Sequence, residues 1–388
     1  MTLTLRALAA ATLVNCVGNG LFMTVSALYF TQVMGLSPAQ VGLGLGAAGL
    51  SGILAGIPLG RLADRWGSRR LLIVLLVLEG AAVLLYTQVS GFAPFVALVC
   101  LVTFLDRGST AVRNTLVAAS FAPEARVGGR AFIRAVINAG VGVGCALAAL
   151  ALQAGTRQAY ELVVVADAAT FLVAAVLMRK VPEPVRQAKE ARGGRNALTD
   201  APYLLVTALN AVLCVQIAVL EFGLPLWIVR ATDAPPVMVA AVLVTNTVMC
   251  VLFQVRASRG ITGVRKAARV CAGSAVLLAV ACLLFSGAGS GGALAAVLLL
   301  LAGAVVQTTA ELYSTAASWA LSYDLADPAS PGAYQGLFST GQAAGILLGP
   351  SLVAATALQH GPAGWLILAA LFVAAGTAMI PATRWATS

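Results

Sequence analysis

Charged side chains are scarce in this chain of 388 residues, since only 10% of its positions are charged and a single histidine is present. A soluble globular domain carries about 25% charged residues, so the ordinary soluble class is excluded. The seven cysteines have no CxxC or other metal-type spacing, and we find no phosphate-binding glycine loop and no nucleophile elbow. We therefore predict no metal, no cofactor and no enzymatic activity, and we interpret the cysteines as small apolar packing residues.

Long apolar runs dominate what is present, because 60% of the residues are hydrophobic. A helix that crosses the hydrocarbon core of a bilayer needs about 20 predominantly apolar residues. The strict alternation of apolar and polar residues that marks a membrane β-barrel is absent. The sequence therefore predicts an all-α membrane protein with twelve transmembrane helices. The twelve runs are 8–30, 39–60, 71–88, 92–121, 130–153, 158–178, 202–229, 237–255, 267–287, 293–319, 334–358 and 362–380.

Arginine and lysine are concentrated in alternate connecting segments, and this asymmetry predicts the orientation. With a cytoplasmic amino terminus, almost all basic residues between the runs lie on the cytoplasmic side, and only Arg157 and Arg230 lie opposite. Both termini are then cytoplasmic. The net charge of +10 needs no nucleic acid to explain it, because basic loops of this kind contact anionic lipid. The composition, rich in arginine, alanine and glycine, is typical of a high-GC bacterium, so we expect the inner membrane of such a cell.

A polar stretch with proline and glycine, residues 179–200, divides the twelve runs into two sets of six. We interpret it as a cytoplasmic linker between an amino-terminal bundle, 1–178, and a carboxyl-terminal bundle, 201–388. The halves repeat each other weakly, since QVRASRG in the second corresponds to GRLADRWG in the first, and ALQHG corresponds to ALQAG. Repeated halves are common in secondary transporters.

The break between the second and third runs, GRLADRWGSRR at residues 60–70, holds four arginines around a single aspartate. It resembles the pattern G-x-x-x-D-R/K-x-G-R/K-R/K between the second and third helices of the major facilitator superfamily, with Ser68 in place of one basic residue. The twelve runs, the linker and the half-repeat extend this resemblance over the whole chain. It implies two pseudo-symmetric six-helix bundles. Residues 130–144, RAFIRAVINAGVGVG, look like fifth-helix sequences of drug-efflux members but lack the proline of their antiporter motif.

This motif supplies candidates for a gate. Gly60 is expected to end the second helix and Gly67 to allow the tight return, while the arginines hold the loop on the cytoplasmic side. A carboxylate suits the positive end of a helix, and the resemblance implies that Asp64 contacts the start of the eleventh helix, near Gln335, with Arg113 as a second partner. The alternative is a plain positive-inside loop with a solvated aspartate. The gating candidates are Gly60, Asp64, Arg65, Gly67, Arg69 and Arg113.

Two runs carry a glycine at every fourth position, a pattern that lets helices approach closely in lipid. The family resemblance implies that these two helices meet. A sliding contact and tight static packing are both compatible with the pattern. The glycines are Gly52, Gly56 and Gly60 in the second run, and Gly341, Gly345 and Gly349 in the eleventh.

The resemblance also implies that the first, fourth, seventh and tenth runs line a central cavity. Each of them carries polar residues at helical spacing within an apolar sequence. Polar groups are costly in hydrocarbon, so a water-filled cleft is their expected place, and sparse polar groups suit small amphipathic molecules. The candidates for contact with a substrate are Asn15, Asn19, Phe22, Thr103, Arg107, Thr110, Asn210, Gln307, Ser314 and Trp319.

Three acids on these runs, Asp106, Glu221 and Glu311, are candidates for carrying protons. Burial favours the protonated form of a carboxyl group and a nearby arginine favours the charged form, so a conformational change that alters either makes the group bind and release a proton. Asp106 ranks first because it lies near the middle of its run, and the rival interpretation is a structural salt bridge. Glu79 and Asp167 fall on runs that the family places outside the cavity, where we expect a packing or interface role.

The predicted function is a proton-coupled secondary transporter that exports small amphipathic or hydrophobic compounds by alternating access. One alternative is a proton-coupled symporter that imports an organic anion or nutrient, with Arg107 as its counter-charge. A second alternative is a membrane sensor or scaffold that transports nothing. The expected partners are a small-molecule substrate, protons and the lipid bilayer, and we expect a monomer.

Overall fold

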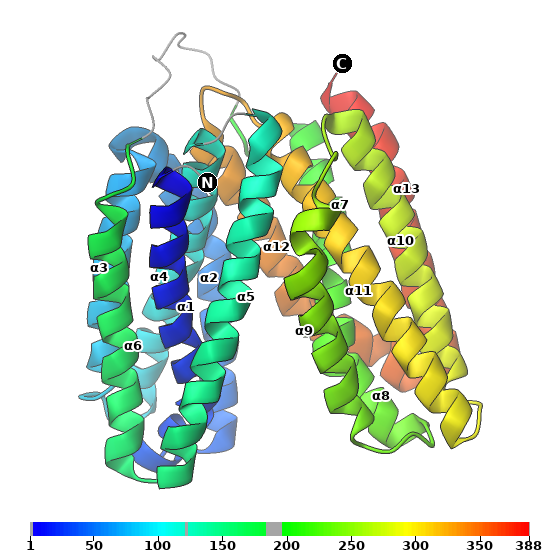
Figure 1. Cartoon of the computed structure of the whole chain (residues 1–388), viewed down its shortest axis with the longest axis horizontal. Helices are drawn as coiled ribbons and strands as arrows, with labels where there is room; N and C mark the ends of the chain where they lie inside the picture. Colours follow the sequence, from blue (N-terminus) through cyan, green and yellow to red (C-terminus); the bar gives the residue numbers. More distant parts are fainter. Residues whose placement is uncertain (1–2, 121–122, 184–195, 388) are drawn as a thin grey trace. The chain divides into compact units, whose positions relative to one another are not determined.

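The computed structural model describes residues 3–120, 123–183 and 196–387. Within these ranges the regular structure is helical and contains no strand (Figure 1). The helices, with η marking a short π-helical segment, are α1 (Leu3–Leu28), η1 (Tyr29–Val33), α2 (Pro38–Trp66), α3 (Ser68–Leu85), α4 (Phe92–Ser120), α5 (Pro123–Ala154), α6 (Arg157–Met178), α7 (Ala201–Ala218), η2 (Val219–Gly223), α8 (Leu224–Ala231), α9 (Met238–Ala257), α10 (Val264–Gly287), α11 (Ala293–Asp324), α12 (Pro331–Val353), η3 (Ala354–Leu358) and α13 (Pro362–Ala386).

Eleven helical segments in these ranges are long and apolar enough to cross a membrane. The remaining predicted span, 71–88, corresponds to α3, whose 18 residues include the charged Arg69, Arg70 and Glu79. Short π-helical segments continue the first, seventh and eleventh spans without breaking them. The predicted all-α membrane protein with twelve long helices is confirmed.

The end of α2 differs from the prediction for Gly60. The helix continues through Gly60 to Trp66, and the residue that ends it is Gly67, whose φ of +94° is one that side-chain-bearing residues rarely adopt. The extra turns carry the exposed Arg61 and Arg65. A helix can continue past an apolar run when the added residues are polar and face water, and hydrophobicity alone therefore underestimates its length.

Polar caps fix where several helices begin. Ser37 and Gln40 form a reciprocal capping box at the start of α2, with the Gln40 side chain 2.9 Å from the Ser37 N–H nitrogen. Thr156 caps α6, and Asp200 caps α7. Each of these side chains accepts a hydrogen bond from an N–H group that the helix itself leaves without a partner.

The helices cluster into two compact units, and unit 1 comprises residues 1–194 and 327–340. In unit 1, α1 packs against α5 and α6, α2 packs against α4, and α3 packs against α4 and α6 (Figure 1). The α1–α5 contact is close because Gly20 and Gly144 face the backbone of the opposite helix, where a Cβ would overlap a carbonyl oxygen.

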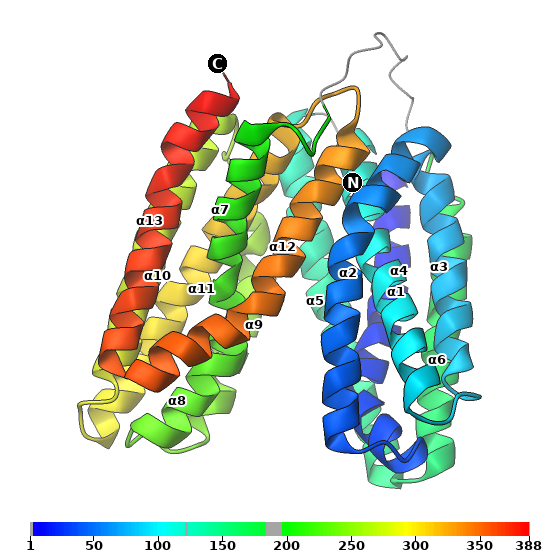
Figure 2. The ribbon, with the colours of Figure 1, turned by 180° about the vertical axis from the view of Figure 1, so that it is seen from behind.

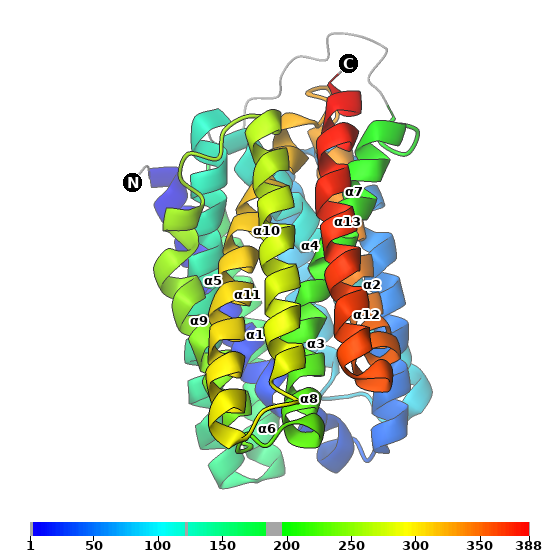
Figure 3. The same cartoon turned by 90° about the vertical axis from the view of Figure 1, so that its right-hand side faces the viewer.

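Unit 2 comprises residues 195–326 and 341–388. Here α10 packs against α11 and α13, α9 packs against α11, and α7 packs against α13 (Figure 3). The division of the chain into 1–178, 179–200 and 201–388 stays a prediction, because residues 184–195 of the linker lie outside the described residues.

Helix α12 is shared between the units. Its first ten residues, 331–340, cluster with unit 1, although they come from the second half of the sequence, and the helix from Gly341 onward clusters with unit 2. The helix is continuous through this point and runs directly into η3 (Figure 2, orange). Nothing in its sequence marked this change of environment.

Candidate functional site

The loop between α2 and α3 is a tight corner closed by Arg69. Its guanidinium Nε lies 3.1 Å from Glu183 Oε2, and another guanidinium N–H donates to the carbonyl oxygen of Val181 at 3.0 Å. A Cβ on Gly67 would come within contact distance of the same Glu183 carboxylate. Arg69 and Gly67 therefore hold the segment after α6 against the beginning of α3, a role that the motif alone did not indicate.

Asp64 binds the N-terminus of α12 within unit 1. Its Oδ1 accepts a hydrogen bond from the N–H of Gly332 at 2.7 Å, and its Oδ2 accepts one from the N–H of Ala333 at 3.0 Å. Because Pro331 has no N–H, these are the first two donors of the helix, and neither has an intrahelical acceptor. A carboxylate at this place satisfies both donors and offsets the positive end of the helix dipole.

Ser330, at the position before α12, has a hydroxyl without a partner among the described residues. Its carbonyl oxygen accepts the first bond of the helix, from the N–H of Tyr334, which makes Ser330 the N-cap residue. A serine N-cap normally accepts from the second or third N–H of its helix. Those N–H groups are taken by Asp64, and the buried Ser330 Oγ is left unbonded.

Glycines bring α2 and the beginning of α12 into backbone contact. A Cβ on Gly60 would overlap the carbonyl oxygen of Gly332, and a Cβ on Gly56 would overlap that of Gly336. Thr340 adds a hydrogen bond from its hydroxyl to the carbonyl oxygen of Ile53, 3.2 Å long. The contact is therefore a helix crossing that only small residues allow.

The glycine ladder predicted for the eleventh run has a different partner. Its members Gly341, Gly345 and Gly349 face residues of α7, where Cβ atoms would meet Thr207, Ala211 and Ala218. Gly52, the third member of the other ladder, faces Thr103 and Arg107 of α4. The two sets of predicted glycines therefore do not pack against each other. The glycines of α12 that contact α2 are Gly332 and Gly336, which precede Gly341 in the helix.

Arg113 is not the second partner of Asp64. No ion pair joins them among the described residues, and the two hydrogen bonds to α12 account for the Asp64 carboxylate. Arg113 lies near enough to Glu79 and Cys16 of unit 1 for its charge to act on both groups.

In unit 1, Asp106 and Arg107 are neighbours on α4, and both are partly exposed. The Arg107 Nε lies 3.8 Å from Asp106 Oδ2, and the two side chains are 46% and 44% exposed. The structural salt bridge considered as the alternative role of Asp106 is therefore formed with Arg107 of the same helix. Thr110 and Asn19 are partly buried on α4 and α1.

Two other candidates of unit 1 lie in its interior. Phe22 stacks on Tyr86 with ring centroids 5.5 Å apart, so it packs between α1 and the end of α3. Asn15 is buried, and its amide Nδ2 has no acceptor among the described residues.

In unit 2, the candidate amides and hydroxyls join α7 to α11. Ser318 donates to Asn210 Oδ1, and Gln216 Nε2 donates to Ser314 Oγ at 3.0 Å. Gln307 Nε2 donates to the backbone carbonyl of Gln216, also at 3.0 Å. These side chains and Trp319 are buried, so the structure brings them together as an interhelical ladder. Gln216 was missed because it lies off the stripe of Asn210 and Glu221, and its polarity in an apolar run was the available signal.

The two acids of unit 2 have different surroundings. Glu311 of α11 is partly buried, and its Oε2 accepts a hydrogen bond from Asn246 Nδ2 of α9 at 2.8 Å. Asn246 also donates to the Thr308 hydroxyl at 3.2 Å. Glu221 is exposed and lies in the π-helical segment η2. Asn246 was missed because its run was not expected to line the cavity, and its polarity in an apolar sequence was the available signal.

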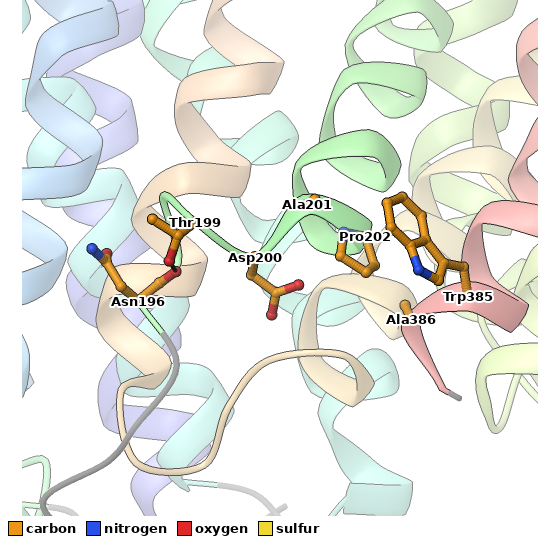
Figure 4. Close-up of a pocket in the computed structure, with 7 residues that line it drawn as sticks. All are labelled: Asn196, Thr199, Asp200, Ala201, Pro202, Trp385 and Ala386. Atoms are coloured by element: carbon orange, nitrogen blue, oxygen red, sulfur yellow. Dashed lines mark hydrogen bonds between the residues drawn. The ribbon is translucent and has the colours of Figure 1, made fainter.

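A pocket of about 370 Å³ opens where α7 begins and α13 ends. Figure 4 shows Asp200, Pro202 and Trp385 around it, together with Asn196, Thr199, Ala201 and Ala386. No predicted site residue lines it. The pocket lies at the ends of two helices, away from the middle of the spans, and we assign it no part in transport.

Comparison with known proteins gives the family. The family model of the Major Facilitator Superfamily matches residues 8–350. No curated protein matches the sequence.

Solved structures share the fold at low sequence identity. A bacterial homologue of the iron transporter ferroportin, in an outward-facing state, is 13% identical, covers 100% of both chains and has a TM-score of 0.77. The human organic anion transporter MFSD10 is 15% identical over 97% of this chain and 99% of its own, with a TM-score of 0.75. The proton:xylose symporter XylE, bound to 6-bromo-6-deoxy-D-glucose, is 14% identical over 96% and 94%, with a TM-score of 0.71.

These matches point to a transporter rather than an enzyme, and they agree with the long apolar helices of a multi-pass membrane protein. The chain belongs to the major facilitator superfamily.

Proposed function

We propose that this protein is a proton-coupled secondary transporter that exports small amphipathic or hydrophobic compounds, drugs included, across a bacterial inner membrane. The observation that carries the proposal is the environment of Glu311. This acid lies in an apolar span and is held by the neutral amide of Asn246, with no ion pair among the described residues. It can therefore gain or lose a proton without breaking a salt bridge.

Asp106 of unit 1 and Glu221 of unit 2 are the other acids proposed to carry protons. Asp106 has an arginine beside it and Glu221 lies in a π-helical segment, a feature that often marks functional positions in helices. A proton crossing 100 mV releases about 2.3 kcal/mol, enough to sustain a substrate gradient of roughly fiftyfold. The entry of one proton for each exported molecule would therefore be sufficient to drive uphill export.

The substrate class follows from the sparse polarity of the candidate residues. Several of these side chains already form hydrogen bonds to a neighbouring helix, namely Asn210, Gln307 and Ser314. Few polar groups therefore remain to bind a substrate. A heavily hydroxylated sugar would need many directed bonds, whereas an amphipathic compound needs apolar surface and few polar contacts.

The second candidate function is proton-coupled uptake of an organic anion. It is favoured by Arg107, whose guanidinium is partly exposed in the predicted cavity-lining helix α4. A human organic anion transporter has this fold, which agrees with an anionic substrate. The proton:xylose symporter has the same fold, so the fold alone does not select the substrate. The ion pair with Asp106 already engages Arg107, which is why we place export first.

Asp64 supplies the proposed gate. Its bonds to Gly332 and Ala333 join α2 to the beginning of α12, and in the proposed transport cycle they break and form again. In alternating access, such a contact favours the state in which the cytoplasmic end is closed.

A flux measurement in proteoliposomes tests the proposal. Ethidium serves as the amphipathic cationic probe, and a pH gradient is imposed in either direction. Antiport predicts that the probe accumulates on the acidic side and that reversal of the gradient reverses its flux, whereas symport predicts the opposite flux. Glu311→Gln should abolish the response to the gradient, and Glu161→Gln, an acid paired with Arg157 at the beginning of α6, is the matched control. Gradient-driven flux that persists in Glu311→Gln would contradict this assignment.

A further inference from the structure

Two acids in unit 1, Glu79 and Asp167, lie in the middle of their helices and are each only 1% exposed. Glu79 follows the beginning of α3 by 11 residues and Asp167 follows the beginning of α6 by ten, which places each about 15 Å along its helix. Helices α3 and α6 pack against each other and α3 also packs against α4. Both acids are therefore buried inside one bundle at mid-depth.

Neither acid forms an ion pair with any residue that the structure describes. Glu79 Oε2 accepts one hydrogen bond, from the Ser109 hydroxyl of α4 at 3.0 Å. Asp167 Oδ1 is buried and accepts none from the described residues. The charges that act on Glu79 are Asp106, Arg113 and Asp167 itself, and the charge that acts on Asp167 is Asp106.

An independent observation comes from α1. Asn15 is 3% exposed, and its amide Nδ2 has no acceptor among the described residues. One turn further, a Cβ on Gly18 would overlap the side chains of Thr170 and Asp167 of α6, and Phe22 one turn beyond stacks on Tyr86 at the end of α3. Residues 15, 18 and 22 share one face of a helix, so Asn15 faces the junction of α3 and α6 where the two acids lie.

This junction thus combines an unpaired amide donor, an unpaired carboxyl oxygen and a second acid bonded only to a hydroxyl. An ionised carboxylate at such a place would be costly, because a charge in the middle of a membrane needs a partner or water. A neutral carboxylic acid needs neither, and it can also donate a hydrogen bond. The arrangement therefore favours the protonated, neutral form of both acids over the ionised form.

We propose that Glu79 and Asp167 are proton-binding sites inside the amino-terminal bundle, and that Asp106, which reaches the surface of unit 1, exchanges protons with them. The step is the addition of one proton to each carboxylate, which gives a carboxylic acid and breaks no other bond. This inference rests on the proposed proton coupling and extends it from residues of the predicted cavity to two that were expected only to pack.

Infrared difference spectroscopy of the purified full-length protein tests the sites without a substrate. The spectrum in mildly acidic buffer minus that in alkaline buffer should contain C=O stretching bands of protonated carboxyl groups, which shift on exchange into D₂O. Asp167→Asn and Glu79→Gln should each remove one component. Asp167→Asn replaces a neutral acid by a group of nearly the same shape, so it should fold normally.

Ser109→Ala provides a second measurement if Glu79→Gln does not fold. Loss of the hydroxyl that donates to Glu79 should move its C=O band to higher frequency without removing it. Ser51→Ala, which removes a hydroxyl bonded to the Cys100 carbonyl oxygen in the α2–α4 contact, is the matched control and should leave the bands unchanged.

The outcomes separate this inference from the proposed function. If the bands remain in both Glu79→Gln and Asp167→Asn, the inference is overturned. If the bands disappear only in Asp106→Asn or Glu311→Gln, the inference is also overturned, but the proposed proton coupling is not. Bands that disappear as predicted, in a protein whose ethidium flux ignores an imposed pH gradient, support the two sites and refute the coupling.

Discussion

Replacing Asp64 with asparagine removes the charge that caps α12 while keeping one acceptor oxygen. The wild-type carboxylate accepts two hydrogen bonds, of 2.7 and 3.0 Å, from donors that the helix leaves free. A hydrogen bond to a charged group contributes about 1.5–3 kcal/mol, and asparagine can replace only one of the two with a weaker neutral bond. We expect the contact to weaken by about 2 kcal/mol, which is roughly a thirtyfold rise in the fraction of molecules in which it is open.

Amide hydrogen exchange measures this change directly. The N–H groups of Gly332 and Ala333 are protected by Asp64 alone, so in Asp64→Asn their exchange should accelerate by about the same thirtyfold. Exchange in a segment such as α10, which lies in unit 2, should not change. Glu161→Gln, another exchange of carboxylate for amide in unit 1, is the control. Unchanged exchange at the beginning of α12 would refute the capping argument.

Ser330 makes the prediction sharper. Its hydroxyl has no partner while Asp64 is in place, so Ser330→Ala should leave the exchange of the wild type unchanged. Once Asp64 is replaced, the same hydroxyl is the nearest substitute cap, and a serine cap contributes about 1 kcal/mol. The double variant should therefore exchange roughly fivefold faster than Asp64→Asn alone. Equal rates in the two would show that Ser330 is no substitute.

The remaining predictions concern close packing and the environment of Glu311. Gly56→Ala places a methyl group on the carbonyl oxygen of Gly336 and should reduce transport strongly without loss of expression, whereas Gly46→Ala on the same helix meets open space and should be silent; equal transport in the two would contradict the packing argument. Asn246→Ala removes the donor on Glu311 and should lower the free energy of unfolding by about 1–3 kcal/mol, read as a lower midpoint of thermal unfolding. Thr247→Ala, whose hydroxyl bonds only to its own helix, is the neutral control, and an equal effect of both would count against the Asn246–Glu311 bond.

The fold was predictable because each span is specified locally. Apolar runs of about 20 residues indicate where a helix can cross a bilayer. All twelve predicted runs correspond to long helical segments. Helix ends were less predictable, as at Gly60, because polar residues such as Arg61 extend a helix without adding to its hydrophobicity. The cap on α12 needed more than local information, since Asp64 and Gly332 are 268 residues apart.

The sequence identifies polar positions within apolar runs, but it does not identify the partners of those side chains. Asn210 and Glu311 were identified as polar positions in apolar runs, yet their partners Ser318 and Asn246 depend on how α7, α9 and α11 are rotated about their axes. Periodicity shows that polar residues share a face, and it leaves open which helix that face meets. The Arg113 partner expected for Asp64 came from the family resemblance, and no ion pair joins the two among the described residues.

Probe flux in proteoliposomes, recorded while the imposed pH gradient is reversed, tests the central claim of proton-coupled transport most directly. The account predicts that ethidium accumulates on the acidic side, that its flux reverses with the gradient, and that Glu311→Gln abolishes the response while Glu161→Gln keeps it. Flux that is identical in both directions of the gradient, or that is the same in liposomes without the protein, would contradict it.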